Sequence, residues 1–341
     1  MVGALFSGQG SQHIGMGDFL LEAFPRAQYV FDEASEVLGF NLTEMVLEGD
    51  EKTLALTENT QPALLALSFA KFRVLKDMGE MKVSVGAGHS VGEYAAMVAS
   101  GALDFKEAIA LVRLRGKLMQ EAVPEGEGAM LAVMGLDAGE VIQLCKWAKE
   151  TNPDLGVIEP ANFNSPAQTV ISGSAKMLRW THREFTPEAI GSGKTKVKLI
   201  PLKVSAPFHC SLMKPAENKM RKALEKAEFH EPQWPIIQNF TSEAVEDSDE
   251  LRENLIRQIS APVRWVECIR TMVDMEVNTV AEFGPGKVLT GLLKKIESEA
   301  ILPFNLNSIA ELKTYDSHLE RMNEKLKEEA RRKKILEDEK S

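Results

Sequence analysis

The chain has 341 residues, of which 44% are hydrophobic and 26% are charged, and its formal net charge is −10. This composition is typical of a globular protein with one large domain or two smaller ones. Because nucleic-acid binding needs a basic surface, the acidic balance argues against a nucleic-acid partner. No apolar run reaches the roughly 20 residues that span a bilayer, so we expect no membrane association.

The three cysteines, Cys145, Cys210 and Cys268, are widely spaced and odd in number. They show neither a metal-binding spacing nor a disulfide framework. We therefore expect reduced thiols and a cytoplasmic location. The N-terminal segment "MVGALFSGQG" lacks the basic and long apolar regions of a signal peptide, which agrees with that location.

The first part of the chain alternates short apolar runs with helical patterns. Buried strands are expected over residues 2–6 and 82–88. Helices are expected over 16–38, 61–79 and 104–123, and another should begin after Val91. This alternation predicts an α/β fold with a parallel sheet.

The pattern changes near Gly128. Strands are expected over 129–136, 155–164, 168–174 and 196–204, with helices over 137–150 and 175–189. The order β-α-β-β-α-β predicts a ferredoxin-like subdomain over residues 127–202. We expect this subdomain to be inserted into a discontinuous α/β domain formed by residues 1–126 and 203–310.

After the subdomain, α/β patterns return, with helices expected over 212–229, 263–277 and 287–299 and strands over 235–240 and 279–286. Residues 311–341 are dense in Lys, Glu and Arg and form a separate, charged tail. An apolar stripe predicts that the tail begins as an amphipathic helix and frays into solvent; its members are Leu312, Tyr315, Leu319, Met322 and Leu326. A short coiled-coil dimer seam is the alternative, but it covers few heptads, and we expect a monomer.

Two glycine-rich segments resemble nucleotide-binding motifs without fitting them. In "SGQGSQHIGMG" the third glycine position of a dinucleotide fingerprint holds His13. In "EAIGSGKT" the first glycine position of a phosphate-binding loop holds Glu188, and the following segment is strand-like rather than helical. We interpret both as ordinary loops.

The segment "VGAGHSVGEYAA" places Ser90 between Gly88 and Gly92 in a G-x-S-x-G pattern. A strand before it and a helix after it match the context of a nucleophile elbow. The nearby helix N-terminus would also supply backbone N–H groups beside the serine oxygen. A serine that merely caps the helix remains an open alternative.

A nucleophilic serine needs a base, and His209 in "VSAPFHCSLMKPA" is the candidate among six histidines. It follows the end of a predicted strand, where α/β sheets carry their sites. His89 adjoins Ser90 in sequence, but adjacent side chains at a tight turn point in different directions. His209 taken alone could equally be an ordinary hydrogen-bonded histidine.

Seven segments occur in one order: "FSGQGSQHIGMG", "TQPALLA", "GHSVGEYAA", "RGKLMQEAVPEGEGAMLAV", "NFNSPAQTVISG", "SAPFHCSLMKPA" and "FGPGKVLTGLL". Together they resemble the malonyl-CoA:acyl carrier protein transacylases over about residues 2–310. The resemblance implies an α/β-hydrolase-like large domain with an inserted ferredoxin-like subdomain. It also implies that Ser90 is acylated by malonyl-CoA, with His209 as general base and acid.

Further roles follow from the same resemblance. A main-chain carbonyl at Gln258 would orient His209, and the backbone amides of Gln9 and Val91 would form the oxyanion hole. Arg115 would bind the malonyl carboxylate and so select against simple acyl groups. The other substrate-binding residues would be Gln61, Met119 and Asn162.

The resemblance implies ping-pong transfer from malonyl-CoA to the phosphopantetheine thiol of acyl carrier protein in fatty acid synthesis, with no metal or redox cofactor. An acidic carrier would need a basic patch, for which the candidates are Lys196, Lys198, Lys294 and Lys295. The alternatives are a serine hydrolase or thioesterase, a stand-alone polyketide-type acyltransferase, and a catalytically silent binding module.

Overall fold

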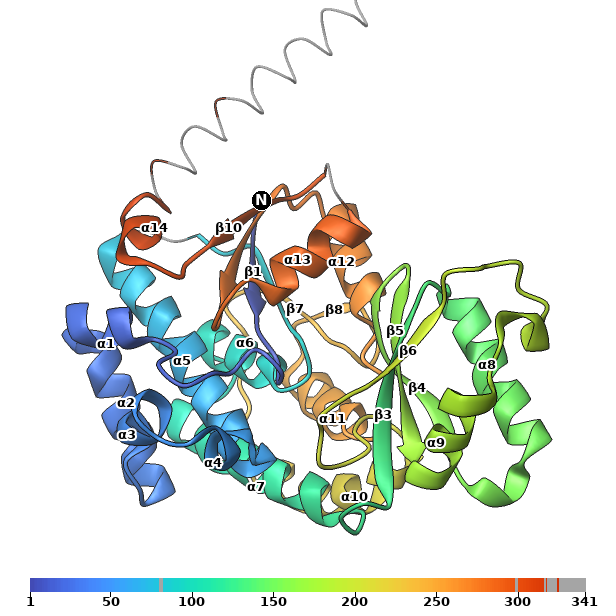
Figure 1. Ribbon diagram of the computed structural model, residues 1–341. Coiled ribbons are helices and arrows are strands. Elements are labelled where there is room, and N and C mark those ends of the chain that lie inside the picture. Colours follow the sequence, from blue (N-terminus) through green and yellow to red (C-terminus); the bar gives the residue numbers. More distant parts are fainter. Residues whose placement is uncertain (80–81, 298–299, 316, 318–323, 325–341) are drawn as a thin grey trace, which may run out of the picture.

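Two β-sheets organise the chain (Figure 1). The computed structural model describes residues 1–79, 82–297, 300–315, 317 and 324. Within these ranges, none of the helices has both the length and the apolar character that crossing a bilayer requires.

The larger sheet has six strands in the order β10-β9-β1-β2-β7-β8. Every neighbouring pair is parallel except β7 and β8. This confirms the expected α/β fold with parallel strands. The strands are β1 (Val2–Phe6), β2 (Val85–Gly88), β7 (Ile236–Ile237), β8 (Ala244–Val245), β9 (Thr279–Phe283) and β10 (Leu302–Asn305).

Helices cover both faces of this sheet, so its strands are apolar on both sides. In β1, Ala4 and Phe6 point to one face and Leu5 to the other, and all three are buried. The Phe6 face packs against α5 (Thr57–Met78) and α6 (Gly92–Ser100), and α7 (Phe105–Glu121) packs in turn against α5. The Leu5 face packs against α12 (Trp265–Asp274) and α13 (Val288–Ile296).

The remaining helices of the larger unit include one correction. The helix expected over residues 16–38 is two helices, because Phe24 has an extended backbone and Pro25 takes the first position of the second helix. The helices are α1 (Asp18–Ala23), α2 (Pro25–Leu38), α3 (Leu42–Leu47), α4 (Glu51–Ala55), α10 (Lys214–Leu224), α11 (Ser248–Gln258) and α14 (Ile309–Lys313).

The second sheet is antiparallel and has the order β4-β5-β3-β6. Helices α8 (Ala138–Thr151) and α9 (Ala175–Glu184) pack on its outer face (Figure 1). The predicted element order is confirmed, although α9 ends five residues early, shortly before Pro187. The strands are β3 (Gly128–Met134), β4 (Ile158–Ser165), β5 (Gln168–Ser174) and β6 (Lys198–Pro201).

The boundary expected at residue 310 falls inside α14. Leu312 and Tyr315 are both 1% exposed, and the Tyr315 ring packs edge-on against Phe304 with centroids 5.1 Å apart. The core of the larger unit therefore continues past the predicted start of the tail. The other predicted stripe residues, Leu319, Met322 and Leu326, lie outside the described residues.

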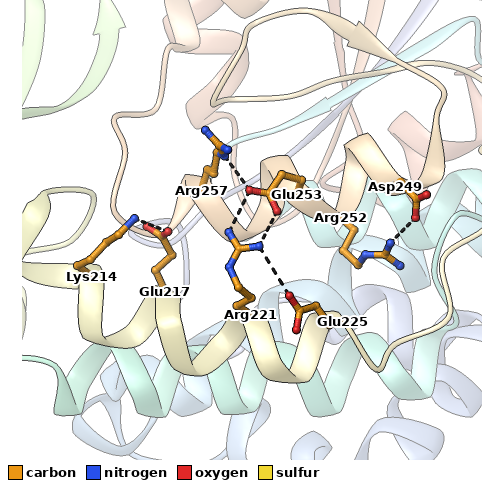
Figure 2. A network of polar contacts seen from close by, with 8 residues as sticks. All are labelled: Lys214, Glu217, Arg221, Glu225, Asp249, Arg252, Glu253 and Arg257. Carbon is orange, nitrogen blue, oxygen red and sulfur yellow. Dashed lines mark hydrogen bonds and ion pairs between the residues drawn. The ribbon is translucent and has the colours of Figure 1, made fainter.

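Helices α10 and α11 are joined by charged side chains (Figure 2). Arg221 makes two hydrogen bonds to Glu253, of 2.7 and 3.0 Å, and Arg257 donates to the same carboxylate at 2.8 Å. These contacts hold the pKa of Glu253 at about 2, chiefly through the Arg221 hydrogen bonds. The pair joins α11, which ends at Gln258, to α10, which begins five residues after His209.

Alanine replacement of Arg221 and Glu253, singly and together, should give a coupling free energy of about 0.5–1 kcal/mol at neutral pH, because both groups are partly solvated. The depressed pKa of Glu253 means that this stabilisation is present above the ordinary value of 4.5 and is lost as the pH falls toward about 2. Urea unfolding of the wild type, the two single variants and the double variant measures this coupling free energy. The more exposed pair Lys146 and Glu150, 3.8 Å apart, is the control and should show almost no coupling.

Candidate active site

Ser90 occupies a strained turn between β2 and α6. Its φ of 54° lies in the left-handed region, which non-glycine residues rarely adopt. The turn needs the glycines on both sides: a Cβ on Gly88 would lie 1.9 Å from the Gly92 carbonyl carbon, and one on Gly92 would lie 2.2 Å from the Phe6 oxygen. The G-x-S-x-G spacing is therefore a packing requirement of this turn.

His209 lies within hydrogen-bond distance of the serine. Its Nε2 is 2.8 Å from Ser90 Oγ, and its Nδ1 is 3.0 Å from the main-chain oxygen of Gln258. A carbonyl can only accept, so Nδ1 carries the hydrogen and the Nε2 lone pair faces the hydroxyl. Burial, and to a smaller extent the charge of Arg115, lowers the pKa of His209 to about 3. The ring is therefore a neutral base at physiological pH.

Arg115 is a buried cation beside the nucleophile and is 1% exposed. Its Nη2 donates to Ser90 Oγ at 3.1 Å and to Gln258 Oε1 at 2.9 Å, and its Nη1 donates to Gln61 Oε1 at 2.8 Å. All three acceptors are uncharged, and among the described residues Nε has no partner. A guanidinium in this setting can bind an incoming carboxylate without first breaking an ion pair.

These groups line a cavity of about 700 Å³ between the two sheets. The inner face of the second sheet supplies Met130 and Val170, which belong to the same apolar core as the larger unit. The cavity also contains each side chain predicted to bind substrate or form the site: Gln9, Gln61, Ser90, Arg115, Met119, Asn162 and His209.

Two backbone amides near Ser90 are free. Within the described chain, the N–H groups of Gln9 and Val91 have no hydrogen-bond acceptor, whereas the Ser90 N–H is bound by Asn239. Val91 directly precedes α6, so its amide lies at the positive end of that helix. Free amides in this position can bind an oxygen that gains negative charge.

The structure also places the remaining residues that the sequence singled out near Ser90. Gln61 lies inside α5 and accepts a hydrogen bond from Arg115, and its Nε2 is 3.9 Å from the Met119 sulfur. Asn162 is on β4 and is 7% exposed. His89 points away from Ser90 as expected, since its Nε2 is 2.9 Å from Asn164 Oδ1.

The four lysines predicted to bind the carrier, Lys196, Lys198, Lys294 and Lys295, are exposed, but none of them lines the cavity. Lys52 and Lys203 are exposed and do line it, although no sequence pattern distinguishes them from other surface lysines. Among the described residues, no group of three or more His, Cys, Asp or Glu side chains could hold a metal ion.

Comparison with known proteins agrees with this geometry. The acyl transferase domain family matches residues 5–314. The chain belongs to the acyl transferase family. It is 44% identical over 293 residues to the malonyl CoA-acyl carrier protein transacylase of Bacillus subtilis, covering 86% of this chain and 89% of that protein.

Solved structures of the acyl transferase family superpose on most of the chain. An acyl carrier protein S-malonyltransferase from Vibrio cholerae is 42% identical with a TM-score of 0.85, covering 92% of this chain and 99% of that one. A malonyl-transacylase in complex with a type II PKS acyl-carrier protein is 43% identical with a TM-score of 0.85, covering 92% and 98% of the two chains.

The lowered pKa of His209 predicts the pH dependence of serine acylation. The base is neutral above its pKa, so kcat/KM should stay level as the pH falls through the ordinary 6.5 and decline only toward about 3. Acylation rates after brief pH jumps, with circular dichroism to confirm that the protein stays folded, measure this. A half-maximal rate near pH 6.5 would contradict the buried, neutral histidine.

Proposed function

We propose that the chain transfers a malonyl group from malonyl-CoA to the phosphopantetheine thiol of acyl carrier protein, through an ester on Ser90. The observation that carries the proposal is a buried arginine bonded to the hydroxyl of a serine–histidine pair, with no carboxylate hydrogen-bonded to it among the described residues. The similarity of this chain to proteins named as malonyl-transferring enzymes supports the same activity.

In the first half-reaction, Ser90 Oγ attacks the thioester carbonyl while His209 Nε2 takes its proton. The Gln258 carbonyl holds the ring through Nδ1 and stabilises the imidazolium that forms. The backbone amides of Gln9 and Val91 bind the tetrahedral oxyanion. The CoA thiolate leaves and takes the proton from the histidine.

Arg115 supplies the specificity for a dicarboxylic acyl group. The malonyl carboxylate is two carbons from the ester carbonyl, and the guanidinium is one hydrogen bond from Ser90 Oγ, so one acyl group can reach both. Gln61 and Gln258 hold the guanidinium in place from two different helices. An acetyl group would leave the buried cation unpaired, which is costly.

In the second half-reaction, the carrier thiol attacks the carbonyl of the Ser90 ester while His209 takes the thiol proton. Ser90 Oγ then leaves and recovers that proton from the histidine, and the malonyl group remains on the carrier as a thioester. The exposed Lys52 and Lys203 at the cavity are suited to the phosphate that CoA and the carrier arm share. The lysines at 196, 198, 294 and 295 remain predicted contacts for an acidic carrier surface.

We also infer the finer architecture from the element order. The parallel six-stranded sheet with helices on both faces supports an α/β-hydrolase-like domain formed by residues 1–126 and the chain after 203. The strand order β4-β5-β3-β6, with two helices on one face, supports a ferredoxin-like subdomain over about residues 127–202.

Intact mass after incubation with malonyl-CoA tests the mechanism. The wild type should gain one malonyl group, and Ser90→Ala should gain none, because the ester oxygen is removed. Adding carrier protein should then move the group to the carrier faster than water removes it. An undiminished adduct on Ser90→Ala, or hydrolysis as the dominant fate with the carrier present, would contradict the proposal.

Arg115→Ala should reduce kcat/KM for malonyl-CoA by about 10²-fold or more while changing that for acetyl-CoA much less. The reason is that only malonyl carries the carboxylate that the guanidinium binds. Arg113→Ala is the matched control, because Arg113 lies on the same helix but bonds the Glu58 carbonyl oxygen at 3.0 Å. Equal losses for the two acyl groups would remove Arg115 from this role.

A further inference from the structure

Asn239 connects the serine turn to a neighbouring strand. It lies two residues beyond the end of β7, which pairs with β2 in the larger sheet, and its side chain is fully buried. Its Oδ1 accepts from the Ser90 N–H at 2.7 Å, and its Nδ2 donates to the Gly88 carbonyl at 2.7 Å. One carboxamide therefore bridges the two sides of the turn.

The partners fix which way this carboxamide points. An N–H on one side requires an acceptor, and a carbonyl on the other requires a donor. The backbone N–H of Asn239 donates in turn to the Glu93 carboxyl on α6, the helix that follows Ser90. The carboxamide of Asn239 is thus bound to the serine turn, and its main chain is bound to the helix that follows the turn.

Both backbone groups of Ser90 are bound by side-chain amides. Asn239 binds the N–H, and Gln258 Nε2 donates to the carbonyl at 3.0 Å. A positive φ at a serine is strained and persists only where surrounding contacts enforce it. Asn239 occupies the Ser90 amide, whereas the next amide, that of Val91, has no acceptor within the described part of the chain.

We propose that Asn239 is a positioning residue, which holds the Ser90 backbone in its left-handed conformation and leaves the Val91 amide to bind the acyl oxygen. This inference rests on the proposed function, since it concerns acylation of the same serine. It assigns Asn239 no contact with substrate, and its effect is transmitted through the turn.

Two substitutions of similar size, Asn239→Leu and Asn239→Asp, test this role. Leu removes both hydrogen bonds, and an ionised Asp places an acceptor against the Gly88 carbonyl. At about pH 8, both should lower the rate constant of Ser90 acylation by malonyl-CoA by about 10²-fold, as expected for a displaced nucleophile. The apparent affinity for malonyl-CoA should change by less than about threefold, because Arg115 and its acceptors remain.

The pH dependence separates positioning from general destabilisation. A protonated carboxyl offers one acceptor and one donor, as the carboxamide does. The acylation rate of N239D divided by that of N239L should therefore rise by about tenfold or more as the pH falls from 8 to 5. The titratable and charged neighbours, Glu93, Arg115, His209 and Cys268, are common to both variants, so the ratio reports the introduced carboxyl.

Asn254→Asp is the matched control. Asn254 is also buried, but its Nδ2 donates to Gln238 Oε1 at 2.8 Å and it has no hydrogen bond to the serine turn in the described chain. It should acylate at the wild-type rate even if its melting temperature falls. If N239L does not fold, N239S takes its place, because a small side chain removes the bridge without adding bulk.

Wild-type acylation rates in the folded Asn239 variants, or a ratio that does not change with pH, would overturn the proposal. A wild type that forms no malonyl adduct would instead contradict the proposed function. The two failures are therefore distinguishable in one set of measurements.

Discussion

The site depends on a positive charge that the fold buries without neutralising. Arg115 is held among the oxygens of Gln61, Gln258 and Ser90, and none of these oxygens carries a formal charge. Burying a guanidinium in this way costs free energy, and an ion pair with a bound carboxylate offsets that cost. The same charge acts on the base, because it helps burial to lower the pKa of His209. In the proposed mechanism, the charge of Arg115 therefore acts twice: it binds the substrate carboxylate and, together with burial, it keeps the base neutral.

Much of the fold could be predicted because its strands are short apolar runs between helical patterns. The runs at β1, β2 and β9 are buried on both faces, which is the condition under which such runs are most distinct. Edge strand β10 was missed, since Pro303 cannot donate to a ladder and is typical of loops. Strand β8 has only two residues and shows no period at all.

The site residues also differ in how far the sequence alone could predict them. Ser90 has a local signal, because its flanking glycines are required by contacts within one turn. His209 has a weaker signal, its place just after a predicted strand, and Arg115 has none. The predicted role of Arg115 came from the resemblance that the seven segments carry, and the same resemblance strengthened the prediction for His209. Asn239 could not be found from the sequence, because its role depends on the pairing of β7 with β2. In the sequence, Asn239 is distinguished only as a polar residue just beyond an apolar run.

The choice of a main-chain carbonyl to orient His209 is consistent with the charge of Arg115. An aspartate in the role of the Gln258 carbonyl would add a negative charge to a site that contains the buried guanidinium, and in the proposed mechanism this charge would oppose binding of a malonyl carboxylate. A carbonyl fixes the same tautomer without adding a negative charge. Glu93, a carboxyl that interacts electrostatically with Arg115, has its pKa raised to about 8 by burial. Burial thus favours the neutral form of Glu93, which in the proposed mechanism reduces its competition with the malonyl carboxylate for the guanidinium.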